Sequence, residues 1–235
     1  MLKQSKYTQA EPLFQRSLHI REQQLGPDHP DVARALNGLA TLYSQQGKYE
    51  EVEPLFQRAL HIREQQLGPD HPLVAVSFSN LADLYSEQGK YEEAEPLYRR
   101  ALHIWEQRVG PEHPDVAHPL TNLASLYSEQ GRYAEAESLF LRALAIREQR
   151  LGPDHPDTAE ALPDLATLRE RQGNRQEALS LYQRALAIRE QAFGPDHPKT
   201  CATRERLTAL RERVGQEAGA SQEEETPPEQ GGQST

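Results

Sequence analysis

Apolar residues recur along the chain three or four positions apart, which is the spacing of one face of an α-helix. In the first clear stretch the apolar positions are Ala33, Leu36, Leu39, Ala40 and Tyr43. After a break at Gly47, a second stretch has them at Val52, Leu55, Phe56, Ala59, Leu60 and Leu67. Glycine readily adopts the left-handed conformation that commonly ends a helix. The pattern therefore predicts two helices, separated near residue 47, each with one buried face.

This two-helix pattern repeats every 42 residues. The phrase GPDHP, or GPEHP in the third copy, begins at Gly26, Gly68, Gly110, Gly152 and Gly194. Its second proline can occupy the first turn of a helix, and the Asp-His before that proline can cap the helix. The period predicts helix pairs at 30–67, 72–109, 114–151 and 156–193.

Neither helix of a pair can bury its apolar face alone, so the pairs must stack on one another. Alanine recurs where helices would approach closely. These positions are Ala40, Ala82, Ala124 and Ala166 in the first helices and Ala59, Ala101, Ala143 and Ala185 in the second. The expected fold class is an all-α solenoid of antiparallel helix pairs.

The repeated positions resemble a known family. Leu39-Ala40, Tyr43, Gly47, Val52, Phe56 and Ala59 match the tetratricopeptide repeat (TPR) pattern at every spacing. The 42-residue period and the LGPDHP connection are similar to the repeats of kinesin light chain, over residues 7 to about 213. The resemblance implies a right-handed TPR superhelix that acts as a protein-binding scaffold, with a ligand segment in its concave groove.

The beginning of the chain departs from the complete pairs. Residues 7–25, within the segment 1–29, match the second helix of a unit without its first helix. Solenoids normally cover an apolar end face, because an open one lowers solubility. This segment therefore indicates either a fragment of a longer array or a face left open for another chain.

The end of the chain also departs from the pattern. In the helix expected at 198–215, Arg204, Thr208 and Arg211 replace apolar residues of earlier copies, as a terminal capping helix requires. Residues 216–235 contain five Glu, no Lys or Arg and no aromatic residue, which predicts a disordered acidic tail. Between the two ends we expect TPR units at 30–71, 72–113, 114–155 and 156–197.

Charge and composition exclude several classes of protein. The 235 residues carry a formal charge of −10, which argues against binding to nucleic-acid backbones or anionic membranes. No stretch approaches the roughly 18 consecutive apolar residues of a membrane-spanning helix. The single cysteine, Cys201, cannot form an internal disulfide, and residues 1–15 lack the apolar core of a secretory signal. We therefore expect a cytoplasmic protein.

No motif in the sequence indicates catalysis. Five histidines recur beside acidic residues, at His29, His71, His113, His155 and His197. Residues one repeat apart stand about 10 Å or more from each other, too far to share a zinc ion whose ligands lie about 2 Å away. We interpret these histidines as helix-start residues. Phosphate-binding, HExxH, GxSxG and dinucleotide motifs are absent, so we expect neither enzymatic activity nor a metal or cofactor.

Two further features have structural interpretations. The charged residues of the repeated RALxIRE phrase, including Arg58 and Arg63, fit a solvated helix face with pairing between residues four apart. Trp105 replaces Arg63 in this series. We interpret it as packing under the GPEHP loop rather than as an anchor for a partner.

By the TPR resemblance, the residues opposite the buried stripe of the first helix of each pair line the groove and contact a peptide. In the first unit they are Arg34, Asn37, Thr41 and Gln45; in the second, Val76, Ser79, Asn80, Asp83 and Glu87. In the third they are His118, Thr121, Asn122, Ser125 and Glu129; in the fourth, Glu160, Asp164 and Arg171, with Thr167 on the same face. Helical spacing alone indicates only that each set shares one polar face.

These residues suggest what kind of ligand binds. Asn37, Asn80 and Asn122 carry both donors and acceptors, so they could bind the backbone of an extended peptide of any sequence. Acidic residues outnumber Arg34 and Arg171 among the expected groove residues. We therefore expect a neutral-to-basic protein or peptide ligand.

Two other functions stay open. The apolar face of residues 7–25 could pair with another array and form a homo-oligomer. The chain could also be a sensor or regulatory fragment of a larger signalling protein.

Overall fold

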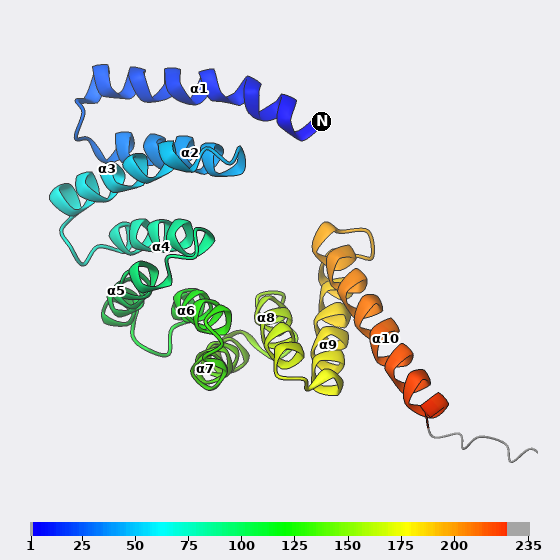
Figure 1. The fold of residues 1–235 in the computed structure, drawn as a ribbon. Helices are drawn as coiled ribbons and strands as arrows, with labels where there is room; N and C mark the ends of the chain where they lie inside the picture. Colours follow the sequence, from blue (N-terminus) through cyan, green and yellow to red (C-terminus); the bar gives the residue numbers. More distant parts are fainter. Residues whose placement is uncertain (1, 225–235) are drawn as a thin grey trace, which may run out of the picture. The chain divides into compact units, whose positions relative to one another are not determined.

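The computed structural model describes the backbone of residues 2–224 and the side chains of residues 10–216. The chain forms two compact units, Met1–Ile146 and Arg147–Thr235. The helices of the first unit are α1 (Leu2–Leu25), α2 (Pro30–Gln45), α3 (Tyr49–Leu67), α4 (Pro72–Glu87), α5 (Tyr91–Val109), the short 3₁₀ turn η1 (Pro114–Val116) and α6 (Ala117–Glu129). The division falls within α7 (Tyr133–Leu151), and the second unit continues with α8 (Thr158–Arg171), α9 (Arg175–Phe193) and α10 (Pro198–Glu224). Over the described backbone every regular element is helical (Figure 1).

The helix pairs expected from the 42-residue period are present. The third pair opens with the 3₁₀ turn η1, and α8 begins at Thr158 instead of residue 156. The last helix differs more, because α10 continues to Glu224 and includes residues 216–224, which the sequence assigns to a disordered tail. Those residues are rich in Glu, Gln and Ala, all good helix formers. Residues 225–235 of the expected tail lie outside the described residues.

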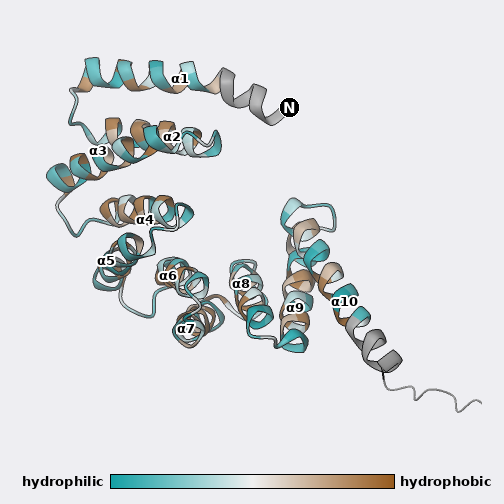
Figure 2. Ribbon diagram, in the orientation of Figure 1, coloured by the Kyte–Doolittle hydropathy of each residue, from teal (hydrophilic) through white to brown (hydrophobic). Residues whose placement is uncertain are grey.

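Within the first unit, each apolar cluster is shared by neighbouring helices. We call α2, α4, α6, α8 and α10 the A helices, and α1, α3, α5, α7 and α9 the B helices. One cluster joins Leu39 and Tyr43 of α2 to Phe56 of α3 and to Leu81 and Leu84 of α4. The next pair thus completes the core of the pair before it, as the stacking argument requires. Apolar residues recur along the helices accordingly (Figure 2).

The GPDHP loops start the A helices as expected. The His29 Nδ1 accepts a hydrogen bond from the Asp31 backbone N–H at 3.1 Å, and His71 makes the same bond to the N–H of Leu73. The other three loop histidines, His113, His155 and His197, repeat this bond at 3.2–3.3 Å. Each loop begins with a glycine at positive φ, such as Gly68 at +85°, a conformation that favours glycine over other residues. His29, His71 and His197 directly precede an α-helix, and His113 caps the 3₁₀ turn η1 that leads into α6. His155 makes the same bond in the turn just before α8, whose first residue is Thr158.

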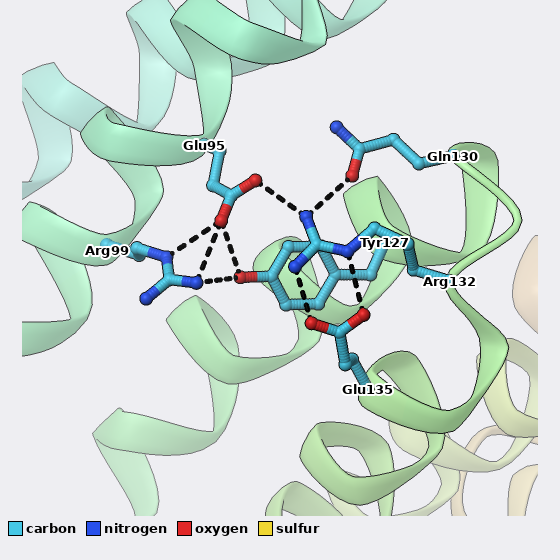
Figure 3. Close-up of polar contacts among 6 residues, drawn as sticks. All are labelled: Glu95, Arg99, Tyr127, Gln130, Arg132 and Glu135. Carbon is cyan, nitrogen blue, oxygen red and sulfur yellow. Dashed lines mark hydrogen bonds and ion pairs between the residues drawn. The ribbon is translucent and has the colours of Figure 1, made fainter.

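A polar network links successive pairs of the first unit on the B-helix side. The Tyr127 hydroxyl of α6 donates to Glu95 of α5 at 2.9 Å, and Arg132 donates to the same carboxylate at 2.7 Å (Figure 3). The Arg132 guanidinium also lies over the Tyr127 ring, 3.9 Å from its centroid. One repeat earlier, the Tyr85 hydroxyl donates to Glu53 at 2.8 Å. A glutamate of one B helix thus holds the tyrosine of the next A helix.

The second unit is built in the same way. Ala166 of α8, Tyr182 of α9 and Leu207 and Leu210 of α10 form one apolar cluster. The helix α10 therefore packs as an A helix on α9. No helix, within the described part of the chain, is long and apolar enough to cross a membrane.

Candidate functional site

The expected groove residues lie on the exposed side of the A helices. In the first unit none is buried, and we call the surface that they form the A-helix face. Its members are Arg34, Asn37, Thr41 and Gln45 on α2, Val76, Ser79, Asn80, Asp83 and Glu87 on α4, and His118, Thr121, Asn122, Ser125 and Glu129 on α6. The remaining four, Glu160, Asp164, Thr167 and Arg171, lie on α8 in the second unit.

Five residues of the A-helix face line one pocket between α4 and α6, with a volume of about 300 Å³. They are Asp83, Glu87, Asn122, Ser125 and Glu129. Ser86, Tyr98 and Leu126 complete the lining, which contains three carboxylates and no lysine or arginine. The structure therefore brings together the acidic members of the first unit's face, and we call this the acidic pocket. The other expected residues of the unit do not line it.

Hydrogen bonds hold two of the three carboxylates of the acidic pocket. The Tyr98 hydroxyl of α5 donates to Asp83 Oδ1 at 2.5 Å. Ser86 Oγ donates to Glu129 Oε2 at 3.0 Å across the two A helices. Each acceptor carboxylate keeps a second oxygen for another donor. The pocket can therefore accept further hydrogen bonds from a ligand.

Asp83 is exposed on α4, and protein atoms of α4, α5 and α6 lie around its carboxyl group. Burial raises the pKa of the Asp83 carboxyl, while the Tyr98 hydroxyl and the nearby His118 act in the opposite direction. Burial and the adjacent Asp83 charge also raise the pKa of Tyr98, which keeps this hydroxyl a donor. A bound cation would favour the charged form of Asp83.

The two glutamates of the acidic pocket occupy unfavourable places on their helices. Glu87 is the last residue of α4 and Glu129 the last of α6. The carbonyl end of a helix carries partial negative charge, so an acidic residue there costs about 0.3–1 kcal/mol of stability. The helix ends and the carboxylates together make this pocket attractive to a cation.

Tyr98 is a pocket residue that sequence analysis missed. It lies one repeat after Phe56, in the apolar stripe of α5, and its side chain is buried. The hydroxyl nevertheless reaches the pocket from the B helix. The only sign of this role in the sequence is that Tyr98 combines an apolar ring with a polar hydroxyl group.

The interpretation of the RALxIRE arginines as a solvated face is wrong for Arg63, whereas the Arg58 side chain is 40% exposed. Arg63 is 5% exposed and donates to the Leu73 carbonyl at 3.0 Å and to Ser77 Oγ at 2.8 Å. With the Asn37 amide oxygen turned towards it, that oxygen also accepts from the Arg63 guanidinium at 2.8 and 2.9 Å. Arg58 instead binds Glu22 at 2.7 Å, one repeat earlier. These arginines link helices, because their partners lie outside their own helix.

The second unit has a different charge pattern on its A helices. Glu160 forms an ion pair with Lys199 of α10. Asp164 is surrounded by protein, and burial raises the pKa of its carboxyl while Arg206, Arg147 and Arg189 lower it. Because α10 packs as an A helix, its basic residues offset these acids. The acidic excess expected for the whole groove is therefore concentrated in the first unit.

Comparison with known proteins shows which family has this architecture. The family model for the tetratricopeptide repeat matches residues 1–65, 46–107, 87–149, 115–191 and 164–225. The chain is a TPR protein. Comparison with curated proteins finds no match.

Solved structures similar to this TPR protein include kinesin-light-chain-like arrays. A crystal structure of a putative kinesin light chain with nearly identical TPR-like repeats from Podosopora anserina is 28% identical, with a TM-score of 0.65. The match covers 83% of this chain and 92% of that chain, and a point variant of the same protein gives a TM-score of 0.66 over the same shares. The crystal structure of BtubC (BKLC) from P. vanneervenii, at 22% identity and a TM-score of 0.70, covers 99% of this chain and 96% of that chain, and shows the fold alone.

TPR arrays are protein–protein interaction scaffolds, and this chain is a scaffold of that kind. Among the described residues, no group of three or more His, Cys, Asp or Glu side chains could hold a metal ion. Cys201 is partly exposed and its thiol faces the Pro195 carbonyl at 3.6 Å. Trp105 is partly buried against apolar clusters on both sides of α5.

Proposed function

We propose that the A-helix face of the first unit is a concave groove that captures an extended, neutral-to-basic peptide segment without catalysing a reaction. The observation that supports this most directly is the acidic pocket. Asp83, Glu87 and Glu129 line it, and no basic residue does. A lysine or arginine side chain of the ligand would supply the missing positive charge.

The asparagines of the A-helix face would bind the ligand backbone. Asn80 and Asn122 are partly exposed on α4 and α6, and Asn122 also lines the acidic pocket. An amide side chain can donate to a peptide carbonyl and accept from a peptide N–H. Backbone binding of this kind tolerates many sequences, so the acidic pocket would supply the selectivity.

Peptide binding by charge-altered variants tests this function. Fluorescein-labelled Gly/Ser peptides containing one lysine or one glutamate would be titrated with the full chain and followed by fluorescence anisotropy. The lysine peptide should bind more tightly. Asp83→Asn with Glu87→Gln and Glu129→Gln should weaken its binding by about tenfold, since each exposed ion pair is worth about 0.2–1 kcal/mol.

A matched variant separates the pocket from the overall charge. Glu50→Gln with Glu92→Gln and Glu93→Gln removes the same number of charges at exposed positions on the B helices α3 and α5. This variant should bind the lysine peptide nearly as well as the wild type. A preference for the glutamate peptide, or equal weakening by both variants, would contradict the proposal.

Self-assembly is a second candidate function, favoured by exposed apolar side chains on α1. Leu13 is 67% exposed, and Ile20 is exposed as well. At the equivalent positions of the first complete pair, Leu55 and Ile62 pack against α2. Light scattering over a wide concentration range should then show a growing mass that Leu13→Glu with Ile20→Glu abolishes. A constant monomer mass would remove this candidate.

A further inference from the structure

The beginning of α4 carries apolar side chains where α2 carries charged ones. Leu73 occupies the position of Asp31, and Val76 the position of Arg34. In α2 those two side chains form an ion pair at 3.1 Å, so the two positions lie in contact one turn apart. Leu73 and Val76 are therefore neighbours, and they are 42% and 36% exposed.

The same repeat replaces a B-helix arginine by tryptophan. Trp105 occupies the position of Arg63, and the other copies have Arg21, Arg147 and Arg189. Arg63 reaches the A helix of its own pair at Asn37. The repeat geometry therefore brings the Trp105 indole towards Ser79, one turn from Val76. Trp105 is partly buried between the core clusters of its own pair and the next.

The residue of the next A helix that lies opposite Trp105 is also apolar. Arg63 donates to Ser77 of the next A helix at 2.8 Å. The position equivalent to Ser77 in α6 is Pro119, whose side chain has no polar atom to pair with an arginine. Arg189 makes the same bond to Thr203, whereas Arg21 and Arg147 have Ala35 and Ala161 at this position. Trp105 with Pro119 is thus the copy in which neither residue has a charged side chain or a hydroxyl group. Leu73 and Val76 of α4 are likewise apolar where the preceding repeat has charged residues.

We propose that Leu73, Val76 and Trp105 form an apolar subsite for one large aliphatic or aromatic side chain of the peptide whose basic residue enters the acidic pocket. This inference rests on the proposed function and adds a second element of sequence selectivity to it. A large apolar side chain gains binding free energy where it covers exposed apolar surface.

The position of Leu73 and Val76 at the beginning of α4 indicates how far apart the apolar and the basic residue of the ligand lie. Val76, Asn80, Asp83 and Glu87 lie three or four residues apart and so form one stripe along the helix. The stripe is apolar at its beginning and acidic at its end. Val76 stands about 10 Å from Asp83 and about 16 Å from Glu87 along the axis, at about 1.5 Å per residue. An extended peptide, at about 3.4 Å per residue, spans this with three to five residues.

Defined peptides and the intrinsic fluorescence of Trp105 test the subsite. Trp105 is the only tryptophan of the chain, so a change in its emission reports on this position. Three Gly/Ser peptides without tryptophan would be compared: one with leucine and lysine four positions apart, one with lysine alone, and one with leucine and glutamate. The leucine–lysine peptide should bind about tenfold more tightly than the lysine peptide. It alone should shift the Trp105 emission.

Variants that restore the pattern of α2 and α3 provide the second measurement. Trp105→Arg with Pro119→Ser recreates the pairing of Arg63 with Ser77, and Val76→Arg recreates Arg34. In both variants the ratio of the two affinities, measured by anisotropy, should fall to about one. Circular dichroism would check that each variant keeps the helical content of the wild type. Leu141→Arg, at an exposed leucine on α7, is the matched control and should keep the tenfold ratio.

The outcomes separate this inference from the proposed function. If both lysine peptides bind equally well to the wild type, the apolar subsite is wrong and the basic-peptide function stands. If neither lysine peptide binds, or if the leucine–glutamate peptide binds best, the proposed function fails and the subsite fails with it. A tenfold ratio that persists in the restored variants would also overturn the subsite.

Discussion

At the scale of single residues, the histidine of each GPDHP or GPEHP loop makes the same hydrogen bond near the start of an A helix. The Nδ1 of each loop histidine accepts the backbone N–H two residues later. The first N–H groups of a helix have no partner within the helix, so this bond satisfies a donor that would otherwise lack one. The repetition of histidine beside acidic residues is therefore explained by helix starts, without a metal.

Replacing one of these caps should lower stability modestly. His71→Ala removes the acceptor for the Leu73 N–H and should cost about 0.5–2 kcal/mol. His71→Asn keeps an acceptor at that position and should lose less. Urea unfolding followed by circular dichroism measures both variants. Equal losses for the two would show that the hydrogen bond does not stabilise the helix start.

Arg63 shows what the sequence pattern could not predict at this scale. Its charge and its place in a charged phrase favour an exposed residue, yet it is buried. Its partners, Ser77 and the Leu73 carbonyl, belong to the following A helix. Helical periodicity within one helix gives no information about such contacts, because they form only after the pairs stack.

Removing the buried arginine should destabilise the first unit strongly. Arg63→Ala removes the packing of the side chain and leaves its acceptors without a partner, at a cost of about 1–3 kcal/mol. Arg34→Ala is the matched control, because its side chain is 69% exposed, and it should stay within about 0.5 kcal/mol of the wild type. Urea unfolding at neutral pH measures the stability of both variants. A loss for Arg34→Ala as large as that for Arg63→Ala would contradict the burial argument.

At the scale of helices, the network around Glu95 ties α5 to the following A helix. Burial raises the pKa of Glu95, but hydrogen bonds from Tyr127, Arg132 and Arg99 outweigh it, so the pKa lies below the usual value. A carboxylate whose pKa falls on folding adds stability above its unfolded pKa, about 4.3 for glutamate. That stability is lost as the pH falls through the lower, folded value.

The lowered pKa of Glu95 predicts how the stability of Glu95→Gln depends on pH. The variant should be less stable than the wild type at pH 7, and the difference should shrink at acidic pH, once the pH has fallen through the lowered pKa of the folded Glu95 carboxyl. Urea unfolding at the two pH values measures the effect. Glu92→Gln, at an exposed position of the same helix, serves as the control. A stability difference that is the same at both pH values would show that the charge of Glu95 is not what stabilises the contact.

Helix order and most helix bounds were predictable, because apolar spacing, capping phrases and glycine breaks all point to the same elements. The extent of α10 was not. Arg204 and Arg211 correctly indicate a solvated side, but they do not show where the helix ends. Composition alone favoured disorder after residue 215, while the local helix propensity of residues 216–224 extends the helix.

At the scale of the whole chain, stability is distributed over neighbouring pairs. Each core cluster draws on two or three adjacent helices, and the chain divides into two units within α7. A protein built from such nearest-neighbour contacts need not unfold in one step. Its two units can differ in stability.

Two spectroscopic probes should therefore report different unfolding transitions. Trp105 belongs to the first unit, so its fluorescence follows that unit, whereas circular dichroism at helical wavelengths follows all helices. In a urea titration the two midpoints should differ. Superimposable curves would show that both units unfold as one cooperative body.

The sequence indicated the acidic residues of the candidate site but not how they combine. Asp83 and Glu87 share a stripe on α4, which periodicity shows. Their proximity to Glu129 and the Tyr98 hydroxyl depends on how α4 and α6 pack across one repeat. Arg204 and Arg211 of α10 were expected on the solvated side of a cap, but the expectation did not include Arg206 of the same helix, which lies near Asp164.

The uniform loops have a consequence for how such a protein can change over generations. Every junction uses the same histidine acceptor and the same glycine turn, so a duplication or loss of one 42-residue block in the gene would join compatible ends. Array length could thus alter in a single genetic event without a new fold being required. The acidic pocket would survive such an event only if the blocks that carry Asp83 and Glu129 stayed adjacent, because both blocks line it.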